Sequence, residues 1–139
     1  ANHDCRHFHQ ETRIYDKKKR MVEHSFYYQS GKLTNRIRYA YDKNGNRKKV
    51  MYLDNNNQIL PGNRSIVLVK YDDQDREIRR TYRNQDNKKI RTPGKVSYVT
   101  TEYFEDHRIE TKYDAQKKVL RKERISGNRV VTIKEEVKE

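Results

Sequence analysis

This chain has few apolar residues, a single cysteine and no long hydrophobic run. Only 32% of its 139 residues are hydrophobic and 38% are charged, against about 45–50% and about 25% in ordinary globular domains. We therefore do not expect a thick hydrophobic core. A lone Cys5 excludes an internal disulfide. Because no run of 18 apolar residues occurs, no membrane-spanning helix is expected.

Motifs that carry catalysis are also absent from the sequence. There is no nucleophile elbow, phosphate-binding Walker loop or metalloprotease helix. His24 and His107 are isolated, and Cys5 has no neighbours that would activate it beyond nearby histidines. We predict that the chain is not an enzyme and that it uses no cofactor.

Metal-ligand residue types crowd together only near the amino terminus, at His3, Cys5, His7 and His9. In a strand, His7 and His9 would point to the same side, which makes His3, His7 and His9 weak candidates for a metal site. Structural zinc sites use four ligands held by a fold, so the alternative is a frayed terminus. We predict no metal site.

What the chain has instead is tyrosine, turn residues and a repeat. Eleven tyrosines pack well on a pleated sheet while their hydroxyls reach water, so a polar sheet can still be ordered. Units of about 30 residues open at Tyr41-Asp42, Tyr71-Asp72 and Tyr103, and a degenerate unit opens at Tyr15-Asp16. A fixed period of this length indicates a repeat architecture.

Turn signals separate short runs of alternating polarity throughout the repeats. Asn44-Gly45 suits a tight hairpin turn, and Pro61-Gly62 and Pro93-Gly94 mark longer ones. Strands of five to nine residues joined by such turns must be antiparallel neighbours. We predict an all-β, up-and-down meander of about nine to eleven strands, as either a single-layer twisted sheet or a curled half-barrel. The domain should span 15–134, between a flexible or edge segment 1–14 and a frayed tail 135–139.

A formal net charge of +13 favours an anionic partner. The alternative is that the cations only keep a solvated sheet soluble. The cations expected to contact a polyanion are Arg47, Lys49, Arg79, Arg80, Lys88 and Lys89.

The Tyr-Asp pairs with their turn residues, best seen from Tyr41 to Arg47, resemble the YD repeat of bacterial Rhs-type surface proteins. The run from Phe26 to Leu33 is similar to the tyrosine-glycine hairpin of MORN-type repeats. The resemblance implies an exported bacterial protein with a role in adhesion, glycan contact or toxin encapsulation. The chain starts at Ala1 rather than at Met, which fits removal of an export signal.

Three functions are compatible with these patterns, and we predict the first, with the other two as alternatives. The first is a non-catalytic binding or structural module that contacts a protein or glycan through a tyrosine-rich face. On that face Tyr52, Tyr82 and Tyr113 stand at matching repeat positions and could form a ladder, unless they form the core. The second is a binder of nucleic acid or of a sulfated or phosphorylated glycan. The third is an antitoxin or immunity partner that covers an acidic protein surface.

Overall fold

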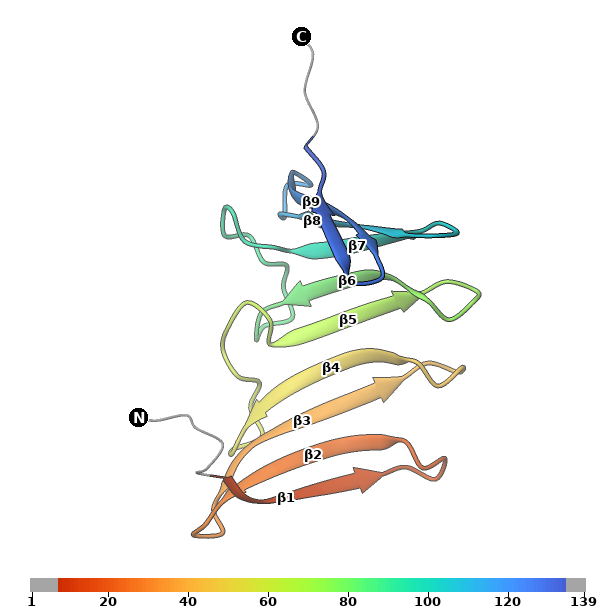
Figure 1. Ribbon diagram of the computed structural model, residues 1–139. Helices are drawn as coiled ribbons and strands as arrows, with labels where there is room; N and C mark the ends of the chain where they lie inside the picture. The colour runs from red at the N-terminus through yellow and green to blue at the C-terminus, as the bar shows by residue number, and fades with distance from the viewer. Residues whose placement is uncertain (1–7, 135–139) are drawn as a thin grey trace.

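The structure, a computed structural model, describes residues 8–134, which form one sheet of ten antiparallel strands and no helix (Figure 1). Each strand pairs with its neighbours in sequence, so the order across the sheet runs from β1 to β10. This confirms the predicted meander. The strands are β1 (Phe8–Tyr15), β2 (Met21–Tyr28), β3 (Leu33–Tyr41), β4 (Arg47–Asp54), β5 (Ile66–Tyr71), β6 (Glu77–Arg83), β7 (Tyr98–Tyr103), β8 (Arg108–Tyr113), β9 (Val119–Ser126) and β10 (Arg129–Thr132).

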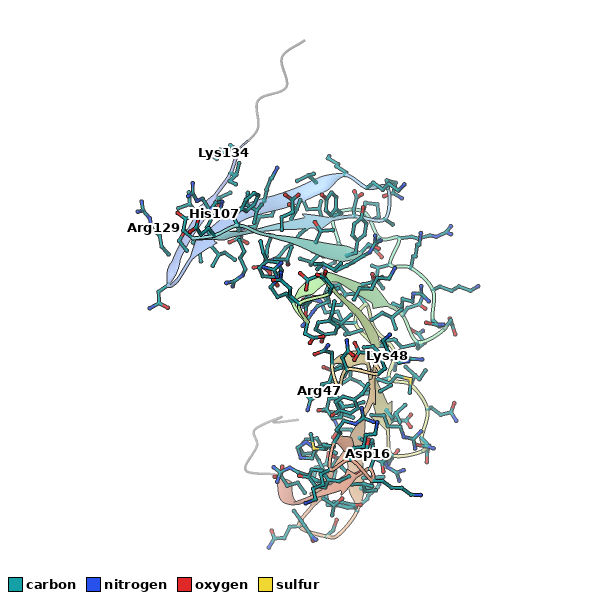
Figure 2. All side chains as sticks on the ribbon, turned by 90° about the vertical axis from the view of Figure 1, so that its right-hand side faces the viewer. Asp16, Arg47, Lys48, His107, Arg129 and Lys134 are labelled. Carbon is teal, nitrogen blue, oxygen red and sulfur yellow. The ribbon has the colours of Figure 1, made fainter. Side chains whose placement is uncertain are left out.

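The sheet is curved and open. Figures 1 and 2 show β1 and the last strands at opposite ends of the curve, and no described strand pairs with the outer edge of β1 or β10. The sheet therefore does not close into a barrel. The part of the chain that the structure describes holds no helix that could cross a membrane.

A small hydrophobic core lies on one face of the middle strands. Cross-strand register places Val50, Val67 and Tyr82 in one row and Val69, Arg80 and Val99 in the next row on the same face. Burying apolar side chains of this size contributes roughly 1.5–3 kcal/mol each. The buried members are Val67, Val69, Tyr82, Ile90 and Val99, with Val50, Tyr71 and Val96 packed against them.

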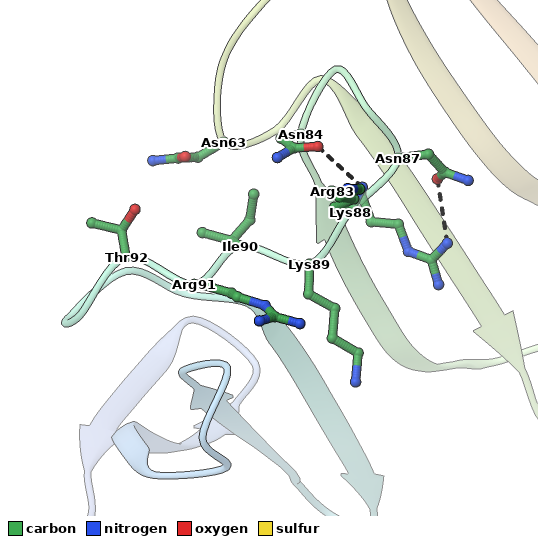
Figure 3. Close-up of a pocket in the computed structure, with 9 residues that line it drawn as sticks. All are labelled: Asn63, Arg83, Asn84, Asn87, Lys88, Lys89, Ile90, Arg91 and Thr92. Carbon is green, nitrogen blue, oxygen red and sulfur yellow. Dashed lines mark hydrogen bonds between the residues drawn. The ribbon is translucent and has the colours of Figure 1, made fainter.

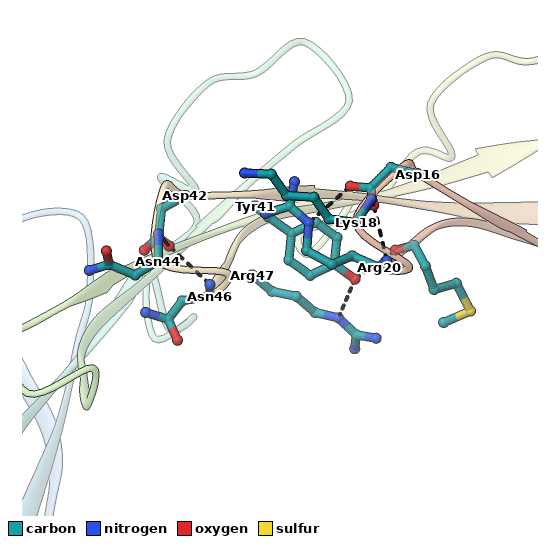
Figure 4. Close-up of polar contacts among 9 residues, drawn as sticks. Asp16, Lys18, Arg20, Tyr41, Asp42, Asn44, Asn46 and Arg47 are labelled. Carbon is teal, nitrogen blue, oxygen red and sulfur yellow. Dashed lines mark hydrogen bonds and ion pairs between the residues drawn. The ribbon is translucent and has the colours of Figure 1, made fainter.

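Six turns follow one hydrogen-bonding plan set by their first residue. The side-chain oxygen of this aspartate or asparagine accepts N–H bonds from the third and fifth residues, at 2.8–3.0 Å. The fourth residue has a positive φ. Short polar side chains favour this arrangement because they reach the backbone directly after them. The first residues are Asp16, Asp42, Asp54, Asp72, Asn84 and Asp114, and Figure 4 shows the turns at Asp16 and Asp42.

Tyrosine hydroxyls tie consecutive hairpins together. Tyr41, at the end of β3, donates its hydroxyl to the carbonyl oxygen of Met21 at 2.6 Å (Figure 4 draws Tyr41 between the two turns). The tyrosine that ends β5 donates its hydroxyl in the same way to the first residue of β4, and the tyrosine that ends β7 donates to the first residue of β6. These bonds are Tyr71 to Arg47 at 2.8 Å and Tyr103 to Glu77 at 2.6 Å. Burial raises the pKa of both Tyr71 and Tyr103, which keeps their hydroxyls protonated as donors.

Two long loops interrupt the simple hairpins. One joins β4 to β5 and the other joins β6 to β7, and each returns to its strand through an isolated antiparallel bridge, Leu53 with Ile59 and Arg83 with Lys89. Each loop ends in a buried serine, Ser65 or Ser97. We call residues 54–65 the first loop and residues 84–97 the second loop.

The sequence predicts a flexible or edge segment at residues 1–14 and a frayed tail at residues 135–139. Residues 8–14, within the segment expected to be flexible or at an edge, form most of the edge strand β1. The candidate ligands His3 and His7, and Cys5, lie outside the described residues, as does the side chain of His9 and the expected tail 135–139.

Candidate anion-binding site

Two of the predicted polyanion contacts stack on tyrosines of the sheet. The guanidinium carbon of Arg47 lies 4.0 Å from the ring centroid of Tyr39, and that of Arg79 lies 4.3 Å from the centroid of Tyr98. Cation–π contacts of this kind hold an arginine against its own sheet. These two cations therefore have a structural role in the folded chain.

Arg80 and Lys49 also lie on strands rather than in a common site. Arg80 donates two hydrogen bonds to the carboxylate of Glu77, at 2.7 and 3.1 Å, and this bond raises the pKa of the Arg80 guanidinium. Lys49 stands opposite Leu68 in the register of β4 and β5. The structure thus distributes four of the six predicted cations over the sheet and brings only Lys88 and Lys89 together.

The three tyrosines predicted to form a ladder do not lie in one row. Tyr52 is exposed and pairs with Ile37, whereas Tyr82 is buried in the core. Tyr113 is stacked on Tyr98, with ring centroids 4.7 Å apart. The cross-strand row through Tyr113 and Tyr98 continues to Thr81, so Tyr113 and Tyr82 face opposite sides of the sheet.

The cause of this difference is one residue of spacing. Tyr52 and Tyr82 stand two residues before the first residue of their turns, Asp54 and Asn84, whereas Tyr113 directly precedes Asp114. Since side chains alternate between faces along a strand, this single-residue step moves Tyr113 to the other face.

A polar hollow of about 700 Å³ lies beside the second loop (Figure 3). Figure 3 shows Lys89 and Arg91 extending to one side of the chain, while Ile90 between them points the other way and is buried. Four of the lining side chains are cations and none is an acid. The lining residues are Asn63, Arg83, Asn84, Asn87, Lys88, Lys89, Ile90, Arg91 and Thr92.

The turn at Asn84 holds this hollow in shape. The side-chain oxygen of Asn84 accepts N–H bonds from Asp86 at 2.9 Å and from Lys88 at 3.0 Å, and Asn87 takes the positive φ of 61°. The bridge between Arg83 and Lys89 then fixes where the chain leaves the turn. The backbone that carries the cations is therefore ordered by hydrogen bonds that do not use their charges.

Arg83 is the most constrained of the four cations. Its Nη1 donates to the side-chain oxygen of Asn87 at 3.3 Å, while its Nε is buried and has no partner among the described residues. A buried donor without an acceptor is costly unless a ligand or water satisfies it. Arg83 therefore contributes an unused charged donor at the wall of the hollow.

The first loop has the same Asp/Asn turn and the same isolated bridge, is two residues shorter, and lacks these four cations. Asp54 orders its turn as Asn84 does, and the backbone N–H of Tyr52 bonds to Ser65 as that of Tyr82 bonds to Ser97, at 3.1 and 2.9 Å. At the positions of the four cations, in the order Arg83, Lys88, Lys89 and Arg91, the first loop has Leu53, Gln58, Ile59 and Pro61.

Four cations around one hollow have the chemistry that suits a phosphate, sulfate or carboxylate group. Guanidinium groups match the oxygens of such groups with paired hydrogen bonds, and ammonium groups add point charge. Asn63 and Thr92 add uncharged hydrogen-bonding groups at the rim. In the described residues, no group of three histidine, cysteine, aspartate or glutamate side chains is arranged to hold a metal ion.

Sequence reasoning identified Lys88 and Lys89 but not Arg83 and Arg91. The signal that could have found them is the comparison of the two loops at an offset of 30 residues, where uncharged residues change to cations. The chain matches no protein-family model and no curated protein. The resemblance to YD and MORN-type repeats therefore stays a prediction, and the function must be inferred from the geometry of this chain.

Proposed function

We propose that this chain is a non-catalytic binding module for an anionic glycan, which it holds at the hollow beside the second loop. The observation that carries the proposal is the contrast between the two loops. Both have the same hydrogen-bonded turn and isolated bridge, so the cations at Arg83, Lys88, Lys89 and Arg91 are not needed to form these two features. Their gathering around one hollow supports a role in binding.

The lining residues favour a glycan over single-stranded nucleic acid. Proteins that bind single strands stack the bases on aromatic side chains, and no aromatic side chain lines this hollow. The nearest tyrosine of the loop's own strand, Tyr82, is buried and covered by Arg64, whose guanidinium carbon lies 4.4 Å from the ring centroid. Amide and hydroxyl groups at the rim suit sugar hydroxyls instead.

The test is the affinity of the purified chain for sulfated heparin oligosaccharides, measured from about 50 to 500 mM salt. The site variant carries Lys88→Gln, Lys89→Gln and Arg91→Gln. It should bind roughly 10- to 100-fold more weakly at low salt and lose about two to three units from the log–log salt slope, because each neutralised charge adds about 0.7–0.9.

A matched control separates the site from total charge. The variant Lys17→Gln, Lys18→Gln, Lys19→Gln removes the same three charges from the exposed β1–β2 turn, and it should change affinity by less than about threefold. Equal losses in both variants would show that charge spread over the sheet binds the ligand, and would contradict the proposal. Uncharged dextran and single-stranded DNA serve as comparison ligands, and tighter binding to the DNA would overturn the choice of a glycan.

A further inference from the structure

The first tyrosine of the repeat lacks the partner that its equivalents have. Tyr41, Tyr71 and Tyr103 end odd-numbered strands, and each donates its hydroxyl to the first residue of the preceding even-numbered strand. Tyr15 ends β1 in the same way, but β1 is an edge, and no described residue accepts its hydroxyl. The side chain is 56% exposed.

The opposite edge of the sheet offers what β1 lacks. β10 is an even-numbered strand that begins at Arg129, and all four of its residues are exposed, including Val130 at 53% and Val131 at 44%. Exposed apolar residues on an unpaired edge favour pairing with a further strand. Because neighbouring strands of this meander are antiparallel, β10 followed by another β1 would continue the same pattern.

We propose that copies of this chain associate head to tail, with β10 of one copy paired antiparallel to β1 of the next. The two edges lie at opposite ends of the curved sheet (Figure 1), so one copy cannot pair them with each other. An interface formed by two different surfaces is heterologous, so it adds copies one after another, in an open chain unless the rotation between copies closes a ring. The partner is thus a second copy of the same chain, and this association does not require a glycan.

The hydroxyl bonds inside the sheet specify the register of this joint. In each of the three pairs, the residue that accepts the hydroxyl stands opposite the residue before the tyrosine. For example, Lys49 pairs with Leu68, so Arg47 stands opposite Lys70, which precedes Tyr71. The pairs β2–β3 and β6–β7 have the same offset. Applied to the joint, this rule places Arg129 opposite Ile14.

The register then sets Val130 opposite Arg13, Val131 opposite Thr12 and Thr132 opposite Glu11. Paired residues must lie on the same face, and they do. The row of paired residues that starts at Arg13 runs through His24 and Ile37 to Tyr52, which lies on the core face. The row that starts at Val130 runs through Ile125 and Arg108 to Tyr103, which also lies on the core face. Side-chain alternation along the strands therefore continues across the joint without a slip.

The register can be tested by cross-linking the full chain. Thr12→Cys with Val131→Cys, in a Cys5→Ser background, places cysteines opposite each other across the joint, and mild oxidation should give a ladder of covalent dimers, trimers and longer species. Shifting one cysteine, as Thr12→Cys with Val130→Cys, puts the thiols on opposite faces and should reduce the ladder at least about fivefold, since disulfides need Cβ atoms about 3.5–4.5 Å apart.

Sedimentation of the unmodified chain completes the test. The average mass should rise steadily with protein concentration, and Tyr15→Phe should weaken this association by several-fold. Higher salt should strengthen it, because the copies repel each other with +13 charges, whereas salt weakens anion binding; each proposal can therefore fail without the other. A mass that stays that of one copy, a dimer that does not grow, or equal cross-linking of both cysteine pairs would overturn the proposal.

Discussion

The first and second loops share a turn, a bridge and a closing serine, and they differ in charge and by two residues in length. In both, an Asp or Asn side chain orders the turn, an isolated bridge returns the chain to its strand, and a buried serine ends the loop. Only the second loop surrounds a hollow lined by four cations. The residues that make the turn hydrogen bonds are of the same chemical type in both loops, whereas the exposed residues between them differ. The turn residues therefore specify the fold, and the exposed positions are free to vary.

Transferring cations of the second loop to the first loop should have the largest effect, because it removes the difference in charge between the two loops. Gln58→Lys, Ile59→Lys and Pro61→Arg give the first loop three of the four cations of the second, with the buried Leu53 left unchanged. We expect heparin chains long enough to reach both loops to bind about tenfold or more tightly, because the second contact becomes intramolecular.

Short heparin oligosaccharides provide the control for this transfer. They should show a second site with little change in affinity for the first. Adding three lysines at the β1–β2 turn instead, where the chain already carries Lys17 to Lys19, should not reproduce the gain. If both additions raise affinity equally, the loop backbone contributes nothing beyond charge.

A smaller effect separates the turn residue from the cations. Asn84→Ala and Asp54→Ala each remove the acceptor of two backbone N–H bonds. Each should lower the free energy of unfolding by about 1–2 kcal/mol, measured by urea denaturation. Only Asn84→Ala should also weaken heparin binding, because only that turn holds cations in place.

Asn84→Asp sharpens the same point. It keeps the turn acceptor, as Asp54 does naturally, so stability should stay within about 0.5 kcal/mol of the parent. It also adds a negative charge to the lining of the hollow and should weaken heparin binding several-fold. Loss of stability in Asn84→Asp, or unchanged binding, would contradict the roles given to the turn and to the charge.

The strands were predictable because turn residues mark their ends. The strands β2, β3 and β8, for example, each begin or end beside an Asp, Asn or Gly turn that the sequence shows directly. The side of the sheet on which Tyr113 lies was not predictable from the repeat alone, since one residue fewer before its turn reverses its face.

The candidate site was only half predictable for a different reason. Lys88 and Lys89 are adjacent in sequence and were identified as a pair, but Arg83 joins them only through the bridge that returns the loop to β6. Arg91 joins them because Ile90 is buried and turns its two neighbours outward. Both relations depend on the bridge and on the burial of Ile90 in the folded chain, which composition and spacing do not contain.

The smallest expected effect compares the charged and uncharged turns as pH falls. Backbone N–H bonds from Asn46 and Asn44 to Asp42 lower the pKa of its carboxyl below 3.8. Because the folded pKa lies below the unfolded one, the stabilisation is fully present above the unfolded value and is lost as pH falls through the folded value. The Asn84 turn makes the same bonds with an amide and cannot titrate.

Thermal unfolding should be measured at pH 7 and near pH 3. The difference in Tm between the two pH values should be slightly smaller for Asp42→Asn than for the parent chain. Asp73→Asn, an exposed aspartate outside these turn bonds, is the control. An equal narrowing in the control would mean that net charge, rather than the turn carboxylate, sets the acid sensitivity of the sheet.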